Sequence, residues 1–281
     1  MSCYQFKKFI FNDGLLNNCV DVTYILYLEG NGRWNSIINQ LNLYHPTSTV
    51  YIVINKGYKK CFKKNINNSV HDILITNIQI FEHALKNNYN NILVLEDDFT
   101  FSPKILERVH TNNICNFINR NNNASFCYLL GCLPCFRIPL NYNTSLAIGY
   151  VAQHSCIYSR KLYIKIIKDY YNNKIVHGID PYLALYNNFN NYMYNIPLCY
   201  QLFTETDNSN NWSKDIYNNS NIILYNLTII AKKIFKILNL DVKFEPGYSF
   251  FYNTSLILFY LSIVIIFIII YKIINIYMKI K

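Results

Sequence analysis

The chain has 281 residues, a formal net charge of +10 at pH 7 and a hydrophobic fraction of 52%, which is enough to bury a core without structural staples. The charge accompanies heavy use of Asn, Ile, Lys and Tyr, whose codons are AT-rich, and no run of basic residues alternates with aromatic ones. Codon composition therefore explains the charge more simply than function does, and we expect no nucleic acid as a partner.

A turn with two glycines follows the first apolar segment. Residues 22–28 form a β-rich apolar run, which predicts a buried strand, and Gly30, Gly32 and Arg33 come directly after it. A glycine loop in this place can approach a nucleotide closely, and an arginine can pair with a diphosphate. We therefore expect these three residues to contact a bound cofactor or donor.

The next informative pattern predicts half of an α/β unit. Residues 74–89 have apolar side chains at positions 74, 78, 81 and 85, which is helical spacing. After an Asn-rich turn, residues 92–95 are apolar throughout, as is typical of a buried strand in a parallel sheet.

Three consecutive acids, Glu96, Asp97 and Asp98, follow this predicted strand. Open α/β sheets place their ligand crevice at the carboxyl ends of the strands. Adjacent carboxylates repel one another, so we expect a cation among them, either Mg²⁺ or Mn²⁺ carrying a substrate diphosphate. Glu96 and Asp98 share one side of an extended segment and are the predicted metal ligands, whereas Asp97 faces the other way and is assigned to cofactor binding. The alternative is an acidic loop without a ligand.

The segment around these acids resembles glycosyltransferase family 25, the lipopolysaccharide and procollagen sugar transferases. Residues 95–98 match the family's Leu-Glu-Asp-Asp, and residues 84–85 match its Ala-Leu. Phe81 stands where the family often has Trp, and Thr76-Asn77 replace its Ser-His. Near the start, Leu28 and Arg33 fit the family pattern, while Tyr27 replaces its usual Asn.

Three later segments extend the resemblance over roughly residues 20–205. In residues 152–160, His154 falls on a family His and Cys156 replaces a Tyr. Residues 177–183 resemble a stretch whose Asp, here Asp180, opens a late helix, and residues 196–201 resemble a Pro-x-x-x-Gln strand. The resemblance implies that His154, His177 and Asp180 activate the acceptor or complete the metal site. Asp180 also suits a purely structural N-cap, with Pro181 at the first helical position.

The resemblance implies an α/β fold of glycosyltransferase type A, a Rossmann-like, mostly parallel sheet with flanking helices. It implies a metal-dependent hexosyltransferase that moves a sugar from a nucleotide-sugar, a UDP-sugar, to an acceptor hydroxyl on a glycan or protein. The replaced Ser-His and Tyr leave open a catalytically inactive relative that serves as a membrane-anchored binding or structural protein. A membrane-associated nucleic-acid-binding protein is suggested only by the net charge.

The C-terminal region predicts a membrane anchor. Residues 250–271 contain no charged side chain and are long enough to span a bilayer. Residues 222–240 form a second apolar stretch whose lysines suit an amphipathic helix at the domain or membrane surface. Because every proposed site residue precedes residue 205, we expect a chain ending near Pro246 to keep its chemistry. The predicted units are an N-terminal segment (1–19), the glycosyltransferase domain (20–205), a linker with an amphipathic helix (206–249), the anchor (250–271) and a short basic tail (272–281).

The orientation in the membrane is predicted from two opposing cues. The N-terminus lacks the apolar core of a signal peptide, and nine dispersed cysteines suit reduced thiols, so we expect a tail-anchored, single-pass protein whose domain is cytosolic. We accordingly expect the pair Cys132-x-x-Cys135 to be loop cysteines and the glycosylation sequons to be unmodified. The lysines after the span favour the opposite orientation.

Overall fold

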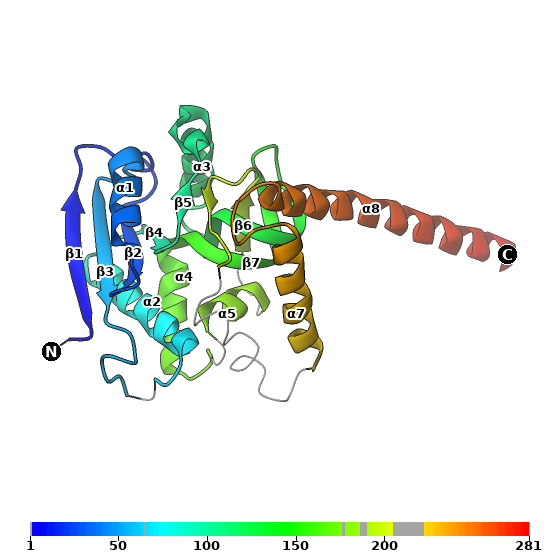
Figure 1. Ribbon diagram of the computed structural model, residues 1–281. Coiled ribbons are helices and arrows are strands. Elements are labelled where there is room, and N and C mark those ends of the chain that lie inside the picture. Colours follow the sequence, from blue (N-terminus) through cyan, green and yellow to red (C-terminus); the bar gives the residue numbers. More distant parts are fainter. Residues whose placement is uncertain (1, 65, 176–177, 186–189, 205–221, 281) are drawn as a thin grey trace.

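A seven-stranded mixed sheet forms the centre of the computed structural model, which describes the chain except residues 1, 65, 176–177, 186–189, 205–221 and 281 (Figure 1). The strand order is β1-β3-β2-β4-β7-β6-β8, and β5 pairs with β9 in a separate ribbon. The strands are β1 (Tyr4–Ile10), β2 (Val22–Leu28), β3 (Thr49–Asn55), β4 (Asn91–Glu96), β5 (Thr100–Phe101), β6 (Phe126–Pro139), β7 (Thr144–Ser159), β8 (Asn190–Tyr194) and β9 (Cys199–Tyr200). The helices are α1 (Trp34–Tyr44), α2 (Ser69–Lys86), η1 (Pro103–Leu106), α3 (Arg108–Arg120), α4 (Arg160–Tyr171), α5 (Ile179–Leu185), α7 (Ile222–Ile237) and α8 (Gly247–Ile280).

The predicted α/β class is confirmed, and the sheet is mixed. Strands β3, β2 and β4 run parallel, and so do β6 and β8. Strands β1 and β7 pair antiparallel with their neighbours. The segment predicted to precede the domain thus supplies the edge strand β1.

Helices cover both faces of the sheet, which explains why β2 and β4 are apolar without alternation. On one face, Ile37 of α1 and Ile118 of α3 pack in a core with Ile25. On the other face, Phe81 of α2 and Ile166 of α4 pack with Tyr24 and its neighbours. Strands β2 and β4 therefore bury both of their sides.

The predicted helix–strand unit is confirmed as α2 and β4, but α2 begins earlier than the apolar spacing indicated. The side chain of Asn68 accepts a hydrogen bond of 2.8 Å from the backbone N–H of His71 and caps the helix. An asparagine N-cap satisfies one of the otherwise unpaired donors, so the helix begins at Ser69, about one turn before the predicted start at residue 74.

The prediction of reduced thiols is wrong for four cysteines. Disulfides join Cys3 to Cys61 and Cys19 to Cys115. The paired residues lie far apart in the sequence, so spacing alone could not reveal them. The prediction of loop cysteines is also wrong, because Cys132 and Cys135 both lie in strand β6; both are free thiols, Cys132 buried and Cys135 exposed.

The C-terminal helix α8 is long and apolar enough to cross a membrane. Its first turns belong to the body, since Tyr248, Tyr252 and Ser255 are buried there. Large apolar side chains are exposed along the helix from Ile257 onwards, where it projects away from the body (Figure 1). The part available to a membrane therefore begins several residues later than the predicted anchor.

Candidate active site

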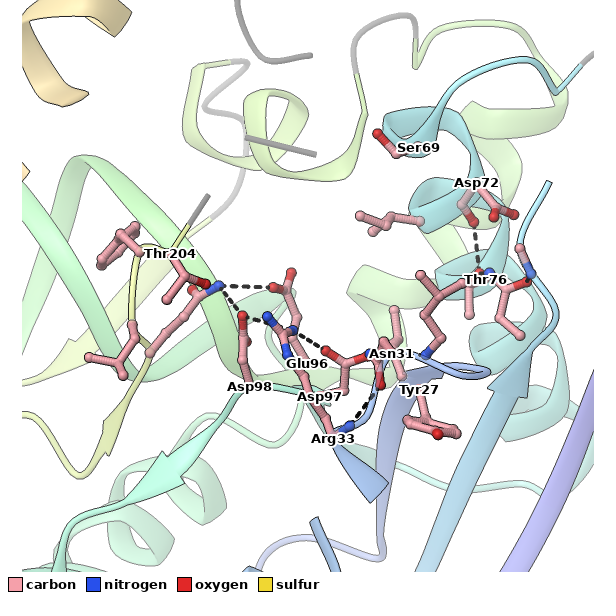
Figure 2. A pocket seen from close by; sticks show the side chains of 18 of the residues that line it. Tyr27, Asn31, Arg33, Ser69, Asp72, Thr76, Glu96, Asp97, Asp98 and Thr204 are labelled. Carbon is pink, nitrogen blue, oxygen red and sulfur yellow. Dashed lines mark hydrogen bonds and ion pairs between the residues drawn. The ribbon is translucent and has the colours of Figure 1, made fainter. Parts of the chain in front are cut away.

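A cleft of about 940 Å³ opens at the carboxyl ends of β2 and β4. Its size lies within the range of small-molecule sites. The three acids at the end of β4, Glu96, Asp97 and Asp98, form one part of its wall, as the sequence predicted (Figure 2). Among the predicted site residues, the cleft is lined by Gly30, Arg33, Glu96, Asp97, Asp98 and Asp180.

Asp97 holds the glycine turn in place. One carboxylate oxygen accepts hydrogen bonds from the backbone N–H of Leu28 at 3.1 Å and from the side chain of Asn31 at 2.5 Å. The other oxygen forms an ion pair with Arg33. Because most of its acceptor capacity is taken up by the protein, Asp97 positions the turn.

The two glycines make this turn possible, since both have a left-handed backbone, with φ of +83° at Gly30 and +80° at Gly32. Gly30 lines the cleft, and a Cβ there would lie 3.2 Å from the Nζ of Lys60. Gly32 does not line the cleft and would have open space around a Cβ. Gly32 therefore shapes the turn without lining the cleft.

Asp98 and Glu96 lie together on the cleft side of the strand end (Figure 2). The amide of Gln201 donates to Asp98 Oδ2 at 3.0 Å and to Glu96 Oε2 at 3.4 Å. Arg33 reaches Asp98 Oδ2 at 3.2 Å. The second oxygen, Asp98 Oδ1, is buried and has no hydrogen-bond partner among the described residues. An unpaired buried carboxylate oxygen is costly, so this atom marks a place for a cation or a donor group.

Burial and mutual repulsion shift the pKa values of these acids. Burial, reinforced by Asp98 and Asp180, raises the pKa of Glu96 well above its ordinary value. Burial raises the pKa of Asp98 to about 6, although the nearby Arg33 opposes the shift. Burial alone lowers the pKa of Arg33, but Asp98 and Asp97 outweigh it, and the net shift is upward. The site therefore has an excess of negative charge that one guanidinium does not neutralise.

Asp180 enters the cleft from α5. The helix begins at Ile179, so Asp180 lies in its first turn and is not the predicted N-cap. Its backbone carbonyl accepts a hydrogen bond of 3.1 Å from Gln153, and burial raises the pKa of its carboxyl group to about 6. A carboxylate with that pKa is suited to take up a proton near neutral pH.

Of the two predicted histidines, His154 does not line the cleft. His154 is fully buried in β7, where its Nε2 lies 3.1 Å from the carbonyl oxygen of Cys199. Burial lowers its pKa to about 4, so the ring is neutral near pH 7. It packs against Gly131, where any Cβ would collide with the same carbonyl. These contacts describe a core histidine, and His177 lies outside the described residues.

Lysines line the cleft together with the acids. They come from the β3–α2 loop and from α7, which are far apart in the sequence, so no local motif revealed them. This arrangement places positive charges near a carboxylate cluster, as binding of a polyanion with its cation requires. These lysines, which we call the lysine wall, are Lys56, Lys59, Lys60, Lys232 and Lys236.

Thr76 takes part in a buried polar network beside the cleft. Thr76 donates to the backbone carbonyl of Asp72 at 2.7 Å and accepts from Asn55 at 2.9 Å. Lys63 is buried between Asn55 and Asp72 and pairs with both. This network fixes the loop after β3, which carries part of the lysine wall.

Two site residues were missed by sequence reasoning. Gln201 follows the short strand β9, and its backbone N–H donates to the hydroxyl of Tyr248 at 2.8 Å. That hydroxyl donates back to the carbonyl of Gln201 at 3.3 Å. Tyr248 belongs to the first turn of α8 and is fully buried. The first turn of α8, which precedes the predicted anchor, therefore positions the glutamine that contacts Asp98.

Within the described ranges, no three His, Cys, Asp or Glu side chains converge as a ready-made metal site. Two carboxylates completed by substrate phosphates are nevertheless a common arrangement for Mg²⁺, which seldom uses an all-protein cage. The unpaired Asp98 Oδ1 and the hard oxygen donors of Glu96 fit such a cation.

Comparisons with known proteins do not assign a family. No family model and no curated protein matches the chain. One similar solved structure is the crystal structure of A197 from STIV, with a TM-score of 0.41 and 10% sequence identity; the match covers 66% of this chain and 86% of that chain. A similarity of this degree supports no conclusion about activity. The fold and the site define the chain as an α/β protein with an acidic cleft and an apolar C-terminal helix.

Proposed function

We propose that this protein is a membrane-anchored glycosyltransferase of type A, related to family 25, which transfers a sugar from a UDP-sugar to an acceptor hydroxyl on a glycan or protein. The observation that carries the proposal is the buried, unpaired Asp98 Oδ1 beside Glu96 at the carboxyl end of β4. The match of residues 95–98 to the family's Leu-Glu-Asp-Asp supports the same assignment.

In this proposal, Glu96 and Asp98 hold Mn²⁺ or Mg²⁺ together with the donor diphosphate. A bound cation would take up the negative charge that develops on the departing nucleotide. The lysine wall contacts the phosphate oxygens, and Arg33 keeps both aspartates in position. Gln201 fixes the orientation of the two metal-binding carboxylates.

Asp180 is the proposed general base. The acceptor oxygen forms a bond to the anomeric carbon, the bond between that carbon and the diphosphate breaks, and the hydroxyl proton passes to the Asp180 carboxylate. A pKa of about 6 leaves most of this group deprotonated at pH 7 while keeping it basic enough to accept the proton.

One observation favours the alternative of an inactive, membrane-anchored binding protein. Arg33 already contacts both Asp97 and Asp98, so a protein cation occupies part of the expected metal position. A screen of nucleotide-sugars with the full chain separates the alternatives. Turnover that requires Mn²⁺ supports the transferase, whereas nucleotide binding without any turnover supports the inactive relative.

The orientation is a separate part of the proposal. The structure does not show the cytosolic placement that the sequence predicts. Two disulfides favour an oxidising compartment for the domain, and the basic tail favours the cytosol for the opposite end. We therefore propose that the domain faces away from the cytosol.

A further inference from the structure

The helix that precedes the anchor has one face in the body and one face exposed. Phe235 of α7 is buried between Phe203 and Phe251, with ring centroids 4.5 and 6.0 Å away. Ile230 and Ile237 are two turns apart on the opposite side of the helix and are 52% and 77% exposed. Two large aliphatic side chains on one outer helix face are unusual for contact with water alone.

Exposed apolar groups continue into the turn between α7 and α8. Val242 is 73% exposed in this turn, and Phe250 is 47% exposed in the first part of α8. Lys233 lies between the two isoleucines on the sequence and is itself exposed. An apolar stripe bordered by lysines is the composition of helices that lie in a membrane interface.

The place of α8 determines which side of the body meets the membrane. Residues 257–278 present large apolar side chains to the outside and contain one charged residue, Lys272. Their helical length of roughly 33 Å matches the thickness of a bilayer core. Helix α7 lies on the side of the body from which α8 projects, and it runs across the direction of α8 (Figure 1). A helix that crosses a membrane-spanning helix in this way lies along the membrane plane.

We propose that Ile230, Lys233, Ile237 and Val242, the α7 surface, rest on the headgroups of an anionic lipid bilayer beside the entry point of α8. The proposal does not depend on the proposed reaction. Its consequence for the site is direct, because Lys232 and Lys236 of the same helix line the cleft, which would then open beside the lipid headgroups.

Fluorescent labels on single introduced, exposed cysteines test this proposal in the full chain reconstituted into vesicles, because the other four free cysteines are buried. The exposed free Cys135 is first changed to serine, and an environment-sensitive probe is then attached at Ile237→Cys. A matched control carries the probe at Leu43→Cys, a position that is 64% exposed. It belongs to helix α1, which lies on the side of the body away from α8 (Figure 1). A third variant, Leu258→Cys, reports insertion of α8.

We expect lipids brominated near the glycerol backbone to quench the probe at 237 at least about twofold more than at 43, and more strongly in vesicles with anionic lipid. Quenching at 258 with none above the control at 237 would overturn the proposal. Absence of quenching at 258 would overturn it as well, because α8 would then not place α7 at a membrane. Lys233→Glu should reduce the quenching at 237 while leaving that at 258 unchanged.

Discussion

The consecutive acids Glu96, Asp97 and Asp98 differ in the contacts that their carboxylates make and therefore in their roles. Asp97 accepts hydrogen bonds from Leu28 and Asn31 and pairs with Arg33, so it stabilises the glycine turn. Asp98 has one oxygen in contact with Gln201 and Arg33 and the other without a partner. Removing charge at these two adjacent positions should therefore have opposite effects on stability.

Asp98→Asn should raise the melting temperature of the metal-free protein at pH 8 and change it little at pH 4. Burial raises the pKa of Asp98 to about 6 in the folded protein, above its unfolded value, so its ionisation costs folding free energy as the pH rises from about 4 to about 6. The expected gain at pH 8 is about 1–2 kcal/mol, or about 2–8 °C. Thermal denaturation across this pH range measures it, and a loss of stability at pH 8 would contradict the assignment.

Asp97→Asn is the matched control, with the same chemical change one residue away. It weakens the ion pair with Arg33 and the contacts to the turn at residues 28–31. Breaking charge-assisted hydrogen bonds of this kind costs about 1–3 kcal/mol. The melting temperature should therefore fall at pH 8, where Asp98→Asn is expected to raise it, and thermal denaturation of the two variants side by side would establish the difference.

At the level of elements, α8 is both the apolar C-terminal helix and part of the site. Its Tyr248 exchanges hydrogen bonds with the backbone of Gln201, and Tyr252 is buried in the body as well. A boundary at Pro246 removes both tyrosines, contrary to the expectation that the domain is complete before it. A boundary after residue 256 retains them.

Two shortened chains and one point variant test this arrangement. The chain ending at residue 256 should fold, whereas the chain ending at residue 246 should be much less stable because it leaves a large apolar surface and the Gln201 backbone exposed. Tyr248→Phe should keep the fold and weaken Mn²⁺ binding several-fold through Gln201. Calorimetry and Mn²⁺ titration provide the measurements; equal stability of the two shortened chains would refute the role of α8.

Local patterns predicted some elements well and others not at all. Strands β2 and β4 were predicted from uninterrupted apolar runs, because burial on both faces requires apolar residues at successive positions. The acids at the end of β4 stand directly after such a run, so their place at the strand end was predicted as well. Strand β1 was missed because its exposed edge keeps lysines among its apolar residues. Gln201, Tyr248 and the lysine wall were missed because the tertiary fold alone brings them to the acids. His154 lies in the core and not in the cleft, because a sequence motif gives a residue's position in the chain but not the direction of its side chain.

At the scale of the whole molecule, the disulfides are the strongest cue to orientation. The two bonds hold β1 and the segment before β2 to distant parts of the fold, and each would contribute about 2–4 kcal/mol. Nine cysteines minus four paired ones leave five free thiols. Alkylation of the denatured protein before reduction should therefore modify five cysteines, and after reduction nine.

Protease treatment of sealed vesicles from the expressing cells provides an independent check of orientation. A domain that faces away from the cytosol is protected until detergent is added, while the lysine tail is accessible. Digestion of the domain in intact vesicles, together with nine thiols that react without reduction, would contradict this orientation and support the cytosolic placement predicted from the sequence.

The central claim is that Glu96 and Asp98 hold a divalent cation together with a nucleotide diphosphate. Calorimetric titration of UDP into the full chain, with and without Mn²⁺, tests it most directly. We predict binding that requires Mn²⁺, is abolished by excess chelator and is weakened at least about 100-fold, or about 2.7 kcal/mol, in a folded Asp98→Asn protein. Equal UDP affinity in chelator, or in the Asp98→Asn protein, would contradict the account.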